Sequence, residues 1–297
     1  MKEKDISVSI IIATYNRSSD LIVTLPQLID RMRPIDELII VDQTLSHSPE
    51  AQVYLDEIKN NPQVSIYQTS PSLTIARNAG LLKATKDVVL YLDDDVDVLC
   101  DLCAETAELY KNPKVAAAAG RVKLPGDNFW TPRKNSKTVT ALYGCHMSFR
   151  RTALLESGGF DIDFKGNFLG EEWEALERIL DQGGIVADGE KCIVFHRLQE
   201  SGGCDNRTLD YKWFRFSYQN HLVWARKRKG VSKFTKFPRH LAAFLKSMMR
   251  YGHPSLFKID KAFINNVIKP AWKESKALAK QSENRELVPQ DFEITKL

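Results

Sequence analysis

The sequence predicts an α/β protein with a Rossmann-like, mainly parallel sheet flanked by helices, followed by a helical and basic C-terminal extension. Short apolar runs rich in β-branched residues, typical of strands buried on both faces, alternate with segments of helical periodicity. This alternation is typical of βαβ units and a parallel sheet. After about residue 210 the pattern becomes helical and basic. We therefore expect two regions, residues 1–210 and residues 211–297.

The expected elements of the first region follow one another in regular order. The expected strands cover residues 6–13, 37–41, 64–67, 88–92 and 115–119. The expected helices cover residues 20–32, 49–60, 72–86 and 98–111. Right-handed crossovers bring the carboxyl ends of parallel strands to one edge of the sheet, and ligands bind outside that edge. Residues that directly follow the strands are therefore the first candidates for function.

The alternation weakens after Gly120. Residues 124–137 are rich in Pro, Gly, Asn and Lys, which predicts a long loop. The later elements expected are a strand over 138–149, helices over 151–157 and 171–181, and a short strand over 193–195.

Composition and charge limit the class of protein. The chain has 297 residues, 43% of them hydrophobic, which is enough for a sizeable core. A net charge of only +4 predicts no nucleic-acid partner. The apolar run 6–13 is too short for a signal peptide, and no stretch approaches the roughly 20 apolar residues of a spanning helix. We expect a cytoplasmic protein whose five cysteines are reduced thiols.

Three consecutive carboxylates follow a buried strand in the run LDDDV. Asp93, Asp94 and Asp95 would repel one another unless a positive group lies beside them. Asp93 and Asp95 point to the same side of an extended turn, and hard divalent cations such as Mg²⁺ or Mn²⁺ prefer such oxygens. A solvated acidic turn is the alternative interpretation.

A single acidic residue, Asp42, ends the strand ELIIVD at the same sheet edge. An acidic residue at this place in a βαβ unit often contacts a ribose or a base, although an Asp that caps a helix or a loop is the alternative. The glycine-rich GxGxxG loop is absent after the first strand, where ATYNR stands instead. This disfavours a dinucleotide cofactor.

Two later features carry titratable side chains. Glu171 and Glu172 open a helix after Gly170, where the helix dipole favours carboxylates and where a general base is also well placed. His196 follows a short strand and precedes a Ser-Gly-Gly segment, and it is a candidate for metal or phosphate contact or for a structural role.

In combination these motifs resemble family 2 glycosyltransferases. The segments VSIIIATYNR, VDQT, ARNAGLLKATKDVVLYLDDDV, GCHMSFRRTALLESGGFD, GEEWEALERI and VFHRLQESGG occur in the order seen in that family, from about Val8 to Gly203. The resemblance implies a GT-A fold, a nucleoside-diphosphate sugar donor and inversion at the anomeric carbon. It also implies a hexosyl- or deoxyhexosyltransferase that acts in cell-surface polysaccharide or glycolipid synthesis.

The resemblance implies a role for each site residue. Asp93 and Asp95 match the metal-binding DxD motif, and His196 matches a late histidine near the metal, Mn²⁺ or Mg²⁺. Glu172 matches the catalytic base, and Glu171 is assigned to acceptor binding or to dipole stabilisation. The expected nucleotide pocket consists of Thr14, Tyr15, Arg17, Asp42, Arg77 and Asp94.

Two positions depart from the family pattern. Gln43 follows Asp42 where the family often has a second acidic residue, so UDP, dTDP and GDP all remain open as donors. Position 172 carries Glu where the family usually has Asp, which extends the carboxylate by one methylene. We expect Glu174, in the same helical turn, to face solvent.

Two alternatives belong to other classes of protein. A sugar-phosphate nucleotidyltransferase would also use an acidic metal site, but ATYNRSS lacks its usual glycine-rich phosphate loop. A non-enzymatic basic binding protein would use the C-terminal region alone, and it leaves the paired carboxylate sites without a role.

The C-terminal region carries a concentrated positive charge. Between Arg226 and Arg250 there are nine Lys or Arg residues and no Asp or Glu. An apolar stripe of helical spacing runs through Leu241, Phe244, Leu245, Met248 and Met249. One interpretation is a helix that packs on the catalytic domain. The other is peripheral attachment to anionic lipid of the inner leaflet, near a lipid-linked acceptor. The expected acceptor is thus a saccharide or a lipid-linked molecule.

Overall fold

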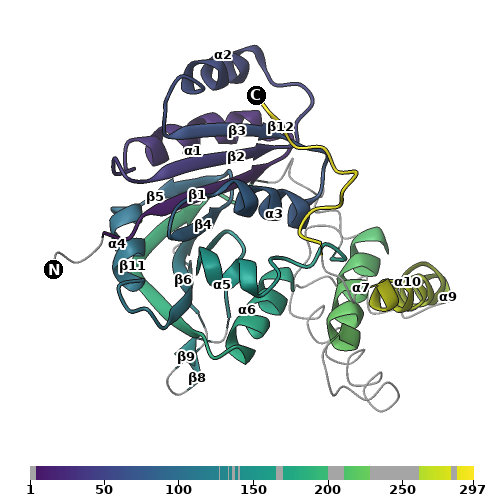
Figure 1. The fold of residues 1–297 in the computed structure, drawn as a ribbon. Helices are drawn as coiled ribbons and strands as arrows, with labels where there is room; N and C mark the ends of the chain where they lie inside the picture. The colour runs from purple at the N-terminus through teal and green to yellow at the C-terminus, as the bar shows by residue number, and fades with distance from the viewer. Residues whose placement is uncertain are drawn as a thin grey trace.

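The computed structural model describes residues 5–126, 128–132, 134–135, 138–139, 141–164, 170–199, 211–227, 261–281 and 286–297. It confirms the α/β class with a mixed sheet in the order β12-β3-β2-β1-β4-β10-β6-β11-β5, with β7 paired to β6 (Figure 1). The pairings β3–β2, β2–β1, β1–β4 and β6–β11 are parallel, and the other five pairings are antiparallel. The strands of this sheet are β1 (Val8–Thr14), β2 (Glu37–Asp42), β3 (Val64–Gln68), β4 (Val88–Leu92), β5 (Val96–Val98), β6 (Val115–Leu124), β7 (Asn128–Trp130), β10 (His146–Arg150), β11 (Ile185–His196) and β12 (Thr295–Lys296).

Helices cover both faces of the sheet. The helices beside the sheet are α1 (Ser18–Ile29), α2 (Pro49–Ile58), α3 (Leu73–Lys83), α4 (Leu102–Leu109), α5 (Arg151–Glu156) and α6 (Glu171–Asp181). Alternate residues of β1 point to opposite faces, so Ile10 and Ile12 pack with α1, α2 and α4, while Ile11 packs with α3, α5 and α6. The apolar runs seen in the sequence are therefore strands buried between two helical layers.

The parallel register aligns the strand ends that carry the polar motifs. Thr14 in β1 lies beside Asp42 in β2, and Ile12 lies beside Leu92 in β4. The segments that follow β1, β2 and β4 therefore leave the sheet at one edge. The site described below is built at this edge.

The prediction of a helix over residues 98–111 is wrong at the N-terminal end. Residues 96–98 form β5, which pairs antiparallel with β11, and the helix begins only at Leu102. Val96 and Val98 are buried, so pairing with a distant strand outweighs local helical propensity. Cys100 consequently lies outside the helix. Cys100, Cys103, Cys145 and Cys192 are free thiols, as predicted.

The region after Gly120 also differs from expectation. The expected loop contains β7, which forms a hairpin with β6, and β8 (Lys134–Asn135), which pairs with β9 (Thr138–Val139). The strand expected over 138–149 is two strands, β9 and β10, and β10 is antiparallel to both its neighbours. The last of the expected strands, β11, is much longer than expected, because a register shift between Gly189 and Ile193 lets it continue through a polar stretch.

Helices dominate the described part of the C-terminal region. They are α7 (Tyr211–Lys227), α9 (Lys261–Phe263), the π-helix η2 (Ile264–Ile268) and α10 (Lys269–Gln281). Proline at position 270 lacks an N–H and clashes with a normal α-helical turn before it, which accounts for the π-helix at that point. Arg226 of α7 lies 4.2 Å from the centre of the Trp272 ring of α10. The two helices therefore pack together.

The end of the chain returns to the sheet. β12 pairs antiparallel with β3 at the edge of the sheet, and the side chains of Val288 and Ile294 pack against the core on the α3 side. The C-terminus accordingly lies beside β3 at the top of Figure 1, whereas α10 lies at the right, next to α7. The apolar stripe expected between 241 and 249 lies outside the described residues.

Candidate active site

The acidic turn after β4 is held in place by two other strands. The backbone N–H of Asp93 donates to the carbonyl of Cys145 at 3.3 Å, just before β10. The N–H of Arg197, just after β11, donates to the carbonyl of Asp95 at 3.0 Å. The direction of the three aspartate side chains is thus fixed by backbone contacts from both sides.

Asp93 and Asp95 converge on His196. The His196 Nε2 atom lies 3.0 Å from Asp95 Oδ1 and 3.7 Å from Asp93 Oδ2. The Asp95 side chain is fully buried, whereas the Asp93 side chain is 34% exposed. This agrees with the expectation that the first and third aspartates point to the same side. Their role as metal ligands remains a prediction.

The donor atoms of this cluster fit a divalent cation. His196 Nδ1 is buried and lacks a hydrogen-bond partner among the described residues, and the buried Asp95 Oδ1 and His196 Nε2 face each other at 3.0 Å without hydrogen-bond geometry. Buried polar atoms without partners are costly, and a metal ion satisfies such atoms. Burial alone would raise the pKa of Asp95, but His196, Arg17 and the Gln199 amide together hold it at about 2. Asp95 is therefore ionised at neutral pH, as a ligand needs to be.

Cys145, which had no predicted role, also lies in this cluster. Its Sγ atom lies within 4.8 Å of donor atoms of Asp93 and His196. Burial, together with the nearby charges of Asp93 and Asp95, raises the pKa of the Cys145 thiol well above its usual value. A protonated thiol is a poor ligand for Mg²⁺ or Mn²⁺, which prefer oxygen. The carboxylates and His196 are thus the better donor set.

Asp94 points away from the metal cluster. It accepts a hydrogen bond from Thr14 Oγ1 at 2.6 Å and pairs with Arg17 at 3.1 Å, and Arg17 also lies 3.2 Å from Asp95 Oδ2. Burial raises the pKa of Asp94 to about 7 despite these partners. Thr14, Arg17 and Asp94 therefore form one hydrogen-bonded group beneath the strand ends, and their contact with a nucleotide remains a prediction.

Asp42 forms a second group, at the end of β2. Its Oδ2 lies 2.6 Å from His47 Nε2, and its Oδ1 accepts the N–H of Thr44 at 2.9 Å. The other ring nitrogen of His47 lies 2.9 Å from Ser18 Oγ at the start of α1. His47 was missed in the sequence because nothing in its spacing links it to Asp42. Tyr15, also expected in the nucleotide pocket, is half-buried in the turn after β1.

The two carboxylates of the GEE motif are buried at the start of α6. Glu172 is only 4% exposed, and its Oε2 accepts the backbone N–H of Gly170 at 3.3 Å. Burial raises the pKa of Glu172 to about 8, and the charge of Glu171 adds to the effect. A carboxylate with this proton affinity is suited to act as a general base near neutral pH.

Arg77 of α3 joins the two acidic groups. Its guanidinium donates to Glu171 Oε1 at 2.7 Å and to the carbonyl of Gly144 at 3.1 Å. Burial lowers the pKa of Arg77, but the charges of Glu171, Asp93 and Glu172 raise it by more. One arginine thus lies within electrostatic reach of both the strand-end acids and the α6 carboxylates. Direct contact with a nucleotide stays a prediction.

The expectation that Glu174 faces solvent is wrong. Glu174 is buried and pairs with Arg178, one turn further along α6, at 2.6 Å. Arg178 in turn donates to the carbonyls of Ser157 and Gly159. The face of α6 that carries Glu174 and Arg178 packs against the segment that follows α5. Glu174 therefore orients Arg178 for its contacts with this segment.

Known proteins share this chain's sequence pattern. The family model described as "Glycosyl transferase family 2" matches residues 9–170. A glucosyl-dolichyl phosphate glucuronosyltransferase of Haloferax volcanii is 24% identical over 245 residues, which cover 72% of this chain and 75% of the relative.

Known structures share its fold. The mannosyltransferase PcManGT from Pyrobaculum calidifontis, in complex with GDP-Man and Mn²⁺, has a TM-score of 0.54 at 15% identity, over 93% of this chain and 88% of the other. GalNAc-T7 with UDP, GalNAc and Mn²⁺ has a TM-score of 0.55 at 18% identity and covers 84% of this chain. The matched region spans 57% of the GalNAc-T7 chain.

The family match covers more than half of the chain, and it includes the acidic turn after β4 and Arg77. The sheet order and the helical layers agree with the GT-A glycosyltransferase fold. The chain belongs to glycosyl transferase family 2.

Proposed function

We propose that the protein is an inverting glycosyltransferase that moves a hexose-type sugar from a nucleoside-diphosphate donor to an acceptor hydroxyl. One observation carries the proposal: Arg77 pairs with Glu171 at 2.7 Å and donates to the carbonyl of Gly144 at 3.1 Å, next to Cys145 of the cluster with Asp93 and His196. One arginine therefore connects the cation-binding cluster with the helix start that carries Glu172. Direct displacement needs such an arrangement, with a group for the leaving diphosphate and a base for the attacking hydroxyl.

In this mechanism the residues divide into two groups. Asp93, Asp95 and His196 would hold Mn²⁺ or Mg²⁺, which when bound would neutralise negative charge on the diphosphate. Glu172 accepts the proton of the acceptor hydroxyl while the oxygen of that hydroxyl bonds to the anomeric carbon. The bond from that carbon to the diphosphate breaks, and its electron pair leaves with the diphosphate. A single displacement inverts the anomeric configuration.

The relatives support the donor class and the metal. The two solved structures hold a nucleotide or nucleotide sugar together with Mn²⁺. The nucleotide pocket of this chain would lie between the Asp42–His47 pair and the group formed by Thr14, Arg17 and Asp94. These residues lie at or just after the carboxyl ends of β1, β2 and β4, where ligands bind in such sheets.

A lipid-linked acceptor at an anionic membrane surface is part of the proposal. The Haloferax relative is named for a dolichyl phosphate substrate. Residues 226–250 carry nine cations and no acid. Lys227 among them is buried against Asp161 and Asp163, and each of the others near an anionic surface would contribute about 1 kcal/mol. No helix within the described ranges is long and apolar enough to cross a bilayer. We propose that attachment rests on the charge of the basic segment. In this proposal residues 1–210 form the catalytic region and residues 211–297 form the extension.

The metal site is tested with Asp93→Asn and Asp95→Asn, which keep side-chain size but remove a ligand charge. We expect both variants to lose sugar transfer and Mn²⁺-dependent nucleotide binding, measured by product formation and calorimetry. Asp97→Asn makes the same change two residues further on, in β5, and should keep both properties. Full activity in EDTA, or in both ligand variants, contradicts the metal assignment.

The base is tested with Glu172→Gln beside Glu171→Gln. Loss of a general base costs about 10²–10⁴-fold in rate, so kcat of Glu172→Gln should fall by that factor with donor affinity nearly unchanged. Glu172→Asp should keep partial activity. Glu171→Gln, which breaks the pair with Arg77, should reduce stability more than turnover. If Glu171→Gln is inactive and Glu172→Gln is active, the assignment is wrong by one residue.

The pH dependence of kcat/KM gives a separate test. Glu172 works as a base only when deprotonated, and its raised pKa of about 8 means that this form is lost as the pH falls below 8. The rate should therefore drop about tenfold per pH unit on the acidic side and level off above the pKa. A flat profile between pH 6 and 8 in the wild-type enzyme would rule out this ionisation.

Membrane attachment is tested by flotation with vesicles. At low salt the protein should float with vesicles that contain anionic phospholipid and not with neutral ones, and 1 M salt should release it, since the Debye length is then about 3 Å. Failure to float with anionic vesicles at low salt would leave the basic segment with a role in packing alone.

A further inference from the structure

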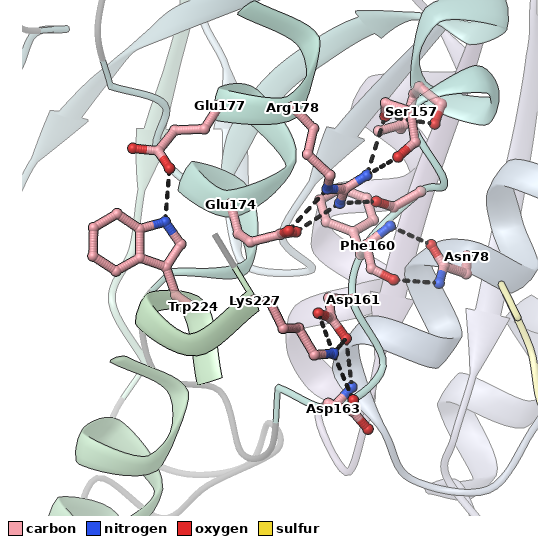
Figure 2. Close-up of polar contacts among 12 residues, drawn as sticks. Asn78, Ser157, Phe160, Asp161, Asp163, Glu174, Glu177, Arg178, Trp224 and Lys227 are labelled. Carbon is pink, nitrogen blue, oxygen red and sulfur yellow. Dashed lines mark hydrogen bonds and ion pairs between the residues drawn. The ribbon is translucent and has the colours of Figure 1, made fainter. Parts of the chain in front are cut away.

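Lys227, the last residue of α7, forms buried ion pairs with the catalytic region. Lys227 Nζ lies 2.9 and 2.6 Å from the two carboxylate oxygens of Asp161 and 2.5 Å from Asp163 Oδ2 (Figure 2). The Lys227 side chain is 4% exposed, and that of Asp161 is 2% exposed. A buried ammonium between two carboxylates holds its surroundings in place, because losing either partner leaves an uncompensated buried charge.

The two aspartates belong to the segment that leads from α5 to the base-bearing helix α6. This segment is also fixed at Phe160, whose backbone N–H and carbonyl both bond to the side chain of Asn78 in α3, each at 2.8 Å. Arg178 of α6 holds Ser157 and Gly159 (Figure 2). Lys227 therefore adds, from the extension, a further contact to the segment that leads to α6.

A second contact from α7 lies beyond the catalytic carboxylates. Trp224 Nε1 donates to Glu177 Oε2 in α6 at 2.7 Å (Figure 2). Trp224 and Lys227 are three residues apart and so share one face of α7. That face thus contacts the chain before Gly170 and again after Glu172. We call these two contacts, Lys227 with Asp161 and Asp163 and Trp224 with Glu177, the α7 clamp.

We propose that the α7 clamp positions the base Glu172, with Lys227 as its main positioning residue; this inference rests on the proposed function. In the sequence, Glu172 lies between the two points that α7 contacts. The ring of Phe164, the residue after Asp163, lies against Gly170, where an added Cβ would be 3.3 Å from it. The N–H of Gly170 in turn donates to Glu172 Oε2 at 3.3 Å. The extension would then be part of the catalytic machinery, in addition to any role at a membrane.

The proposal predicts a specific kinetic effect. A misplacement of about 1 Å caused by a distant mutation costs on the order of 10²-fold in rate. Lys227→Met should therefore lower kcat by about 10–10²-fold while the Kd for the nucleoside diphosphate stays within about twofold, because the strand-end site is untouched. Lys227→Arg keeps the charge and should restore most of kcat.

A milder variant keeps the test valid if Lys227→Met does not fold. Asp163→Asn leaves Lys227 and Asp161 as a balanced pair, so the fold should persist while one clamp contact weakens. We expect a several-fold fall in kcat with an unchanged nucleotide Kd. Unchanged kcat in Asp163→Asn and in a folded Lys227→Met would overturn the proposal.

The matched control is Arg215→Met. Arg215 also lies on α7, but its partner is Glu274 of α10, so this ion pair lies within the extension. The control should lose some thermal stability and keep its kcat. If Lys227→Met and Arg215→Met lower Tm alike and both keep kcat, α7 is a structural element only and the inference fails.

Glu172→Gln, assayed in parallel, separates this inference from the proposed function. An inactive Glu172→Gln together with a fully active Lys227→Met overturns the clamp and leaves the base assignment intact. An active Glu172→Gln overturns the base assignment, and the clamp with it.

Discussion

Electrostatic balance at one edge of the sheet is the constraint on which the rest of the site depends. Five carboxylates gather there: Asp94, Asp95, Glu171 and Glu172 are buried, and the Asp93 side chain is 34% exposed. Buried like charges repel and take up protons unless cations lie among them. Arg17 meets the strand-end group from the start of α1, and Arg77 meets both groups from α3. These two arginines let the acids stay close together in the fold.

The position of α3 follows from this constraint and links distant parts of the chain. Two adjacent residues of α3, Arg77 and Asn78, point to different partners: Arg77 to Glu171, and Asn78 to Phe160 and to the carbonyl of Leu287 near the C-terminus. The strand-end site, the segment before α6 and the returning chain end are therefore fixed to one helix. A shift of α3 would move all three at once, so the packing of its buried face against the sheet matters to the chemistry as well as to stability.

Much of the fold could be predicted from the sequence, because each of the first strands is a buried apolar run whose period and length are local properties. The acidic turn and the GEE motif could also be recognised, because each is a run of neighbouring residues in the sequence. β5 and β12 could not be found in this way, since each exists through pairing with a strand far away in sequence. The partners of the site residues were equally hidden. The contacts of His47 with Asp42, of Arg178 with Glu174 and of Lys227 with Asp161 depend on how the elements pack.

The raised pKa of Glu172 shows how one arrangement serves both folding and chemistry. Burial and the neighbouring Glu171 raise it, while Arg77 and the N–H of Gly170 lower it. Without Arg77, two adjacent buried carboxylates would bind a proton too tightly for either to act as a base near neutral pH. With a cation paired directly to Glu172, the carboxylate would be too weak a base. Arg77 instead bonds to Glu171 and acts on Glu172 only through space. The cation that makes the acidic cluster stable thereby also leaves Glu172 able to take a proton.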